Sequence, residues 1–101
     1  MSTLKDRYQQ SYGDLITKLQ VKDPIFSARL YSAGLFPGNT RAEVQSKATS
    51  AEAAMHFLDN VINRGWSNDN SNTQFEQLLT IMANCDDAVV KTLAADIKKG
   101  V

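Results

Sequence analysis

The single histidine and the single cysteine are the two side chains of this 101-residue chain that could do catalytic chemistry together. An imidazole beside a thiol can activate it as a nucleophile, so Cys85 and His56 form a formal candidate pair. Neither residue has a recognisable flanking signature, and no glycine-rich turn offers donors for an oxyanion. One imidazole and one thiol also fall short of a tetrahedral metal site. We therefore expect no enzyme activity, no metal and no cofactor, with both residues at the boundary or surface of the fold.

The glycines and paired acids also fail to indicate a site for chemistry. The segment from Gly34 to Gly38 lacks the lysine and the spacing of a phosphate-binding loop. Asp86 and Asp87 are explained by the start of a helix, whose positive end favours negative charge. Lys98 and Lys99 would complement the negative end of the same helix and need no ligand.

Charge is balanced overall but unevenly distributed along the chain. Eleven basic and eleven acidic residues give a formal net charge of zero, and so no global attraction to nucleic acid or an anionic membrane. Residues 1–50 hold seven basic and four acidic side chains, whereas residues 51–101 hold four and seven. The halves are therefore +3 and −3, which could let one copy dock head-to-tail on another. Ordinary solvated faces also produce such charge blocks.

The composition indicates one cytoplasmic domain over residues 1–101, alone or as a module of a larger protein. A single cysteine cannot form an intramolecular disulfide. No apolar stretch at the N-terminus resembles a signal peptide, and no window of about 18 apolar residues could span a bilayer. We expect no nucleic-acid, membrane or small-molecule partner.

Start and stop signals divide the chain into six short helices and predict an all-α antiparallel bundle. A hydroxyl precedes a carboxylate by three residues, the capping-box pattern, at Thr3–Asp6, Thr40–Glu43, Thr49–Glu52 and Thr73–Glu76. Further starts are indicated by Asp23-Pro24 and Asp86-Asp87. Left-handed helix stops are expected at Gly34, Gly65 and Gly100. The predicted helices span residues 3–20, 24–33, 40–47, 51–64, 74–84 and 87–99.

Apolar residues at three- and four-residue spacing predict which side of each helix is buried. The broadest stripe, in residues 51–64, consists of Ala51, Ala54, Met55, Leu58, Val61 and Ile62, with Phe57 beside it. Gly13 predicts a bend in the first helix. Leu35 and Phe36 are expected to fold back into the core, and Trp66 to cover one end of the bundle.

The ordered segments resemble the death-fold superfamily, and within it a caspase recruitment domain (CARD). The segments that resemble its helices are Leu15–Leu19, Leu30–Phe36, Thr40–Val44, Ala51–Gly65 and Phe75–Leu79. They are core patterns and not catalytic signatures. The polar stretch 66–72 is longer than the family pattern, and Phe57-Leu58 replaces a frequent leucine pair. Death-effector, pyrin and death domains therefore remain alternatives.

The resemblance implies homotypic binding to another CARD or death-fold domain, in apoptotic or innate-immune signalling, with self-association into oligomers or filaments. In the family, a face of helices 1 and 4 often meets a face of helices 2 and 3. The first face would here offer Lys5, Arg7, Lys18 and Arg64. The second would offer Asp23, Arg29, Arg41, Glu43 and Lys47. Further contacts are implied for Trp66, Asp69, Asp86 and Asp87.

Two other functional classes compete with a docking module. A helical carrier of apolar ligands would need a cavity, which Phe26, Met55, Phe57 and Met82 could line. An enzyme would need a Cys85 thiol that reacts unusually fast with alkylating reagents. On the docking hypothesis, charge reversal at Arg41 or Arg64 abolishes partner binding and leaves helicity intact.

Overall fold

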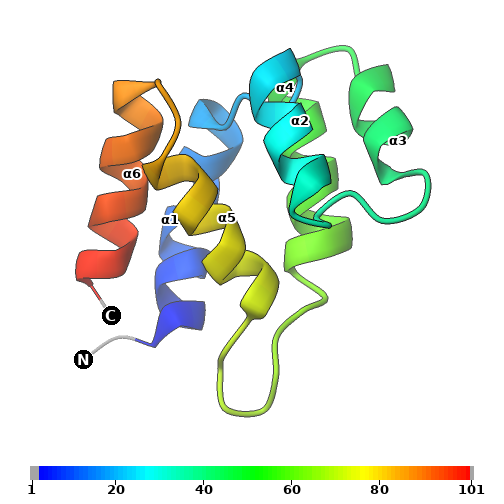
Figure 1. Ribbon diagram of the computed structural model, residues 1–101. Coiled ribbons are helices and arrows are strands. Elements are labelled where there is room, and N and C mark those ends of the chain that lie inside the picture. Colours follow the sequence, from blue (N-terminus) through cyan, green and yellow to red (C-terminus); the bar gives the residue numbers. More distant parts are fainter. Residues whose placement is uncertain (1–2, 101) are drawn as a thin grey trace.

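The computed structural model describes residues 3–100. Within this range the chain forms six α-helices and one π-helical turn, joined by loops, and no strand (Figure 1). The elements are α1 (Leu4–Lys18), α2 (Pro24–Ser32), α3 (Thr40–Ser46), α4 (Ser50–Phe57), η1 (Leu58–Ile62), α5 (Thr73–Ala83) and α6 (Ala88–Lys99). The predicted all-helical bundle is confirmed. α1 packs against both α4 and α6, α5 packs against α6, and α2 lies on α5. α3 contacts α4 at the outer edge of the molecule, on the side away from α6 (Figure 1).

Four of the six predicted helix starts are confirmed at the residue that caps them. The Thr3 hydroxyl accepts from the Asp6 amide while the Asp6 carboxylate accepts from the Thr3 amide, which completes a capping box. Asp23 and Asp87 cap α2 and α6 through their carboxylates. The Thr49 hydroxyl caps α4 by accepting from the amide of Glu52.

The other two predicted starts are each wrong by one residue. α3 and α5 are preceded by Asn39 and Asn72, so Thr40 and Thr73 are the first residues inside their helices and not the caps. At α5 the physical reason is that Asn72 makes two hydrogen bonds at once, through two separate atoms of its side-chain amide. Its side-chain oxygen accepts from the Phe75 amide at 3.0 Å, and its side-chain nitrogen donates to the Ile62 carbonyl at 2.7 Å.

Of the three predicted glycine stops, Gly34 alone has the left-handed backbone. Its φ is +80°, and the Leu35 amide donates to the Leu30 carbonyl in a Schellman arrangement. Gly100 has a φ of −84°, and the φ of Gly65 is not positive either. Gly65 is instead required by a close approach, because an added Cβ would lie 2.7 Å from the side-chain oxygen of Asn72.

The predicted single helix over residues 51–64 is two elements. α4 ends at Phe57 and a π-helical turn follows, in which the Asn63 amide donates to the Leu58 carbonyl at 2.7 Å. The buried side runs through both elements and consists of Ala53, Ala54, Phe57, Leu58, Val61 and Ile62. The predicted buried stripe is therefore wrong at Met55, which is 45% exposed, and at Ala51, which is also exposed.

The core otherwise follows the predicted apolar positions. Leu35 and Phe36 fold back into it as expected, and the Phe36 ring meets Phe57 edge-on at 5.4 Å. Ile25 and Val89 are apolar but 63% and 53% exposed, because each lies one residue before a buried side chain, that of Phe26 or Val90. α1 continues through Gly13 without a break in the helix.

Asn72 offers a test of this account of the fold. Asn72→Ala should lower the free energy of unfolding by about 2 kcal/mol, because it removes a helix cap and one of the two hydrogen bonds to the Ile62 carbonyl, which keeps only the bond from the Gly65 amide. Asn39→Ala is the matched control, since the Asn39 side chain makes no capping bond and its loss should cost well under about 1 kcal/mol. Urea unfolding followed by circular dichroism measures both. Equal losses would contradict the assigned role of Asn72.

Candidate interaction surface

An exposed tyrosine and an arginine from neighbouring helices form the most distinctive surface feature. Tyr31 on α2 is 56% exposed, and the guanidinium carbon of Arg41 on α3 lies 5.0 Å from the centre of its ring. This distance is typical of a cation–π contact. Tyrosine and arginine are also the residue types most enriched at binding hot spots. We call this pair the Tyr31–Arg41 patch.

Polar contacts hold α3 in the position that brings Arg41 to Tyr31. Val44 is the buried apolar anchor of this seven-residue helix. Gln45 donates to the Ser27 hydroxyl at 3.3 Å, which ties α3 to α2. Glu43 accepts from the His56 ring at 3.1 Å, which ties α3 to α4. Glu43 is therefore half of an internal pair as well as a surface carboxylate.

The α1–α2 and α3–α4 connections are also joined. The Lys22 ammonium donates to the Lys47 carbonyl at 2.5 Å. The same contact fixes the backbone at Lys47, the residue that ends α3. The Lys47 side chain itself remains half-buried.

A second exposed patch lies on α4 and η1. Met55 is flanked by the carboxylates of Glu52 and Asp59, which are both exposed. Spacings of three and four residues place these side chains along one side of the helix. We call this set the Met55 patch. It is acidic with an apolar centre, whereas the Tyr31–Arg41 patch is basic with an aromatic centre.

The predicted basic face of helices 1 and 4 is only partly available. The Arg7 guanidinium donates to the Asp96 carbonyl at 2.8 Å and to the Gln10 side chain at 3.1 Å, so it fastens α1 to the end of α6. Lys5 and Lys18 are half-buried. Arg64 is exposed just beyond η1. The structure does not gather these four side chains into one basic patch with an exposed centre.

Tyr12 and Asp59 form the hydrogen bond that joins α1 to η1. The Tyr12 hydroxyl donates to the Asp59 carboxylate at 2.5 Å. Burial, followed by that hydrogen bond and the negative charge of Asp59, raises the pKa of Tyr12 to about 12. Burial, with smaller contributions from Tyr12 and Asp59, also raises the pKa of the neighbouring Tyr8 above its ordinary value.

Trp66 packs as the expected cover for one end of the bundle. It is half-buried, with its ring centre 5.4 Å from that of Tyr8 and 5.8 Å from that of Phe75. The loop after it is a self-contained turn, in which Asp69 accepts from the hydroxyls of Ser67 and Ser71. These bonds lower the pKa of Asp69. The candidate residues Trp66 and Asp69 are thus both used in local structure.

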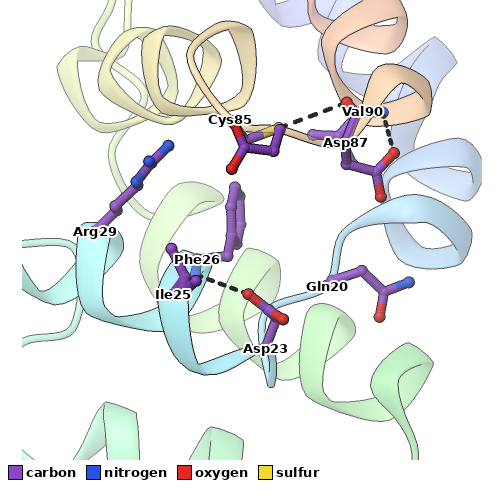
Figure 2. A pocket seen from close by; sticks show the side chains of 9 residues that line it. Gln20, Asp23, Ile25, Phe26, Arg29, Cys85, Asp87 and Val90 are labelled. Atoms are coloured by element: carbon purple, nitrogen blue, oxygen red, sulfur yellow. Dashed lines mark hydrogen bonds between the residues drawn. The ribbon is translucent and has the colours of Figure 1, made fainter.

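The α5–α6 corner borders a cleft of about 250 Å³ between the start of α2 and the start of α6. Figure 2 shows Phe26 and Cys85 at its centre, with Arg29 on one side and Asp23 and Asp87 on the other. The Arg29 guanidinium donates to the Asn84 carbonyl at 2.9 Å. Asp86 is exposed and also lines this cleft. We call the hollow the acid cleft, after Asp23, Asp86 and Asp87.

Cys85 and His56, the candidate catalytic pair, do not contact one another. Cys85 is buried and its thiol donates to the Met82 carbonyl at 3.0 Å, whereas the ring of His56 contacts Glu43 and Asn60. No group of three potential metal-ligating side chains occurs among residues 3–100. Nor does any helix in that range combine the length and apolar character needed to cross a membrane.

The residues that the carrier hypothesis placed around a cavity do not line a common space. Phe57 and Met82 are fully buried in the core, and Met55 faces solvent. Phe26 lines the acid cleft at the surface.

Three exposed side chains, those of Tyr31, Ile25 and Met55, were not predicted from the sequence to lie at the surface. A signal for the first two was present, because Tyr31 and Ile25 each lie one residue from the Phe26–Leu30 stripe that faces the core. Met55 gave no such signal, since it fits the apolar stripe of an unbroken α-helix.

Comparison with protein-family models, with curated proteins and with solved structures found no match to this chain.

The Tyr12–Asp59 hydrogen bond predicts that the stability of the fold depends on pH in the alkaline range. The neutral Tyr12 hydroxyl is favoured in the folded state, and an unfolded tyrosine ionises near pH 10. The stability that depends on this bond should therefore be complete below pH 10 and should fall as pH rises toward 12.

Ultraviolet titration of the phenols should show a group that ionises near pH 12 and disappears in Tyr12→Phe. In Asp59→Asn that ionisation should move to lower pH, because the carboxylate charge is removed. An unchanged titration curve in Tyr12→Phe would contradict the assignment.

Proposed function

We propose that this chain is a non-enzymatic docking module of the death-fold type, similar to a CARD, that binds a like domain. The observation behind the proposal is the exposed Tyr31–Arg41 patch, held in place by the contacts of α3. A cation–π contact between a solvent-exposed tyrosine and arginine adds little to the stability of the monomer. The same two residue types are enriched at the centres of protein interfaces. A role in recruiting partners in cytoplasmic apoptotic or innate-immune signalling follows from the same resemblance.

The Met55 patch is the complementary surface in this proposal. The Arg41 guanidinium can form a charge-assisted hydrogen bond with the carboxylate of Glu52 or Asp59 on another copy. The Met55 thioether can pack against the exposed Tyr31 ring, since sulfur–aromatic contacts are favourable. Each patch thus supplies what the other lacks, in both charge and apolar surface.

Charge along the chain supports this pairing. Residues 20–49, which contain α2 and α3, hold four basic and two acidic side chains. Residues 50–87, which contain α4, η1 and α5, hold one basic and six acidic side chains. Complementary charge steers the encounter and selects the partner more than it adds affinity.

The two patches are different surfaces of one molecule, so the proposed contact is heterologous. Such contacts produce rings if the rotation closes and open filaments if it does not. The proposed activity is therefore concentration-dependent assembly. The death-fold part of the proposal is supported by six short helices in about 100 residues and by the apolar turn Leu35-Phe36 packed in the core.

Charge swapping tests the proposed contact. Arg41→Glu and Glu52→Arg should each weaken self-association about tenfold or more, because each places like charges opposite one another. The double variant should recover assembly, since it restores an opposite-charge pair with the sides exchanged. Light scattering against concentration, with negative-stain imaging, measures the effect.

Lys91→Glu is the matched control, because it makes the same charge change at an exposed position on α6 that belongs to neither patch. Circular dichroism checks that all variants keep their helicity. Normal assembly of Arg41→Glu, or failure of the double variant to recover, would overturn the proposed pairing.

A further inference from the structure

A second exposed surface of α2 faces away from the Tyr31–Arg41 patch. On one edge of this helix, Tyr31 and Ser27 contact α3. On the other edge, Ile25, Ala28 and Arg29 line a groove against Ile81 of α5 and Asn84, the residue that follows α5. This α2–α5 groove is a shallow hollow of about 740 Å³ that is open to solvent. Its apolar lining residues are Pro24, Ile25, Ala28, Ala33 and Ile81, and its polar ones are Arg29, Ser32, Thr80 and Asn84. It shares Ile25 and Arg29 with the acid cleft, so the two hollows are neighbouring parts of one surface.

Arg29 is the polar group at the junction of groove and cleft. The only hydrogen bond of its side chain within residues 3–100 is to the Asn84 carbonyl, a neutral acceptor, and no carboxylate in that range lies within ion-pair distance of the guanidinium. A carboxylate adds a full opposite charge and can accept two parallel hydrogen bonds from a guanidinium, whereas the Asn84 carbonyl accepts one. A carboxylate brought to this point would therefore displace the Asn84 carbonyl as the preferred partner of Arg29.

The cleft beyond Arg29 has the opposite charge. Asp23 and Asp87 each use one side-chain oxygen to cap a helix and leave the other oxygen available. Asp86 makes no side-chain hydrogen bond within residues 3–100. The floor between these acids is apolar, with Phe26 and Val90 (Figure 2). A basic side chain with a long apolar stem matches this lining.

We propose that the groove binds an amphipathic helix of a partner protein that presents an apolar side chain, a carboxylate and a basic group one helical turn apart. The apolar side chain lies against Ile25 and Ile81, the carboxylate meets Arg29, and the basic group enters the acid cleft. A helix suits the site because small side chains at helical spacing allow close helix packing, and the surface offers no strand edge within residues 3–100. This surface lies outside both patches of the proposed homotypic contact.

The experiment uses three fluorescent stapled helices of fifteen residues. The parent peptide has Leu, Glu and Lys at positions i, i+4 and i+8, and the other two replace Glu or Lys with Gln. Anisotropy should show binding of the parent to the full chain and about tenfold weaker binding of each Gln peptide. Amide spectra of the ¹⁵N-labelled chain should change at Ala28, Ile81 and Asn84.

Matched changes in the protein locate the contact. Arg29→Gln should remove the preference for the Glu peptide over its Gln version, and Ile81→Asp should abolish binding. Arg41→Glu, which disrupts the proposed homotypic contact, should bind the parent peptide unchanged, so failure of that contact and failure of this groove are distinguishable. Circular dichroism of each variant verifies folding, and Arg29→Lys provides a second variant if Arg29→Gln unfolds.

Three results would overturn the proposal. The first is no binding of the parent peptide at millimolar concentration. The second is binding that is indifferent to the Glu and Lys side chains or that maps to another face. The third is self-association of the chain that Ile81→Asp abolishes, which would make a second copy the occupant of the groove.

Discussion

The rotation of α4 relative to the core is the constraint on which the rest of this molecule depends. α4 packs against α1 and α3 and must bury Ala53, Ala54 and Phe57, while η1 must bury Leu58. These residues lie on one side of the helix at three- and four-residue spacing, and Val61 and Ile62 continue that side through the π-helical turn. The same rotation turns Met55 outward and brings His56 to Glu43. The orientation of α4 thus sets both an exposed patch and the position of α3.

The surfaces follow from how the short helices close on one another. α3 is too short to be stable alone and depends on Val44 and on bonds to α2 and α4. Its placement exposes the Tyr31–Arg41 patch. α2 is covered on two sides and leaves its third side as the wall of the α2–α5 groove. Function in this account belongs to the outer face of each helix, since the inner faces are used in the core.

Helix existence and class could be predicted from the sequence because caps and apolar spacing are local signals. Thr3, Asp23 and Asp87 each cap the helix that begins at the next residue, so the adjacent sequence is enough to recognise them. Predictions failed where a distant partner decided the outcome. Asn72 outcompetes Thr73 because it also reaches Ile62, and Arg7 leaves the predicted basic face because it meets the end of α6. The two exposed patches likewise require α2, α3 and α4 to be placed in space before their residues can be grouped.

Disulfide trapping measures the central claim most directly, because it asks whether Tyr31 of one copy meets Met55 of another. Two single variants, Tyr31→Cys and Met55→Cys, are mixed at a concentration at which the chain assembles, in a Cys85→Ser background. The account predicts rapid formation of the mixed 31–55 disulfide dimer, faster than either symmetric dimer and faster than a Tyr31→Cys mixture with Lys91→Cys. A chain that stays monomeric at millimolar concentration, or equal rates for all pairs, would contradict it.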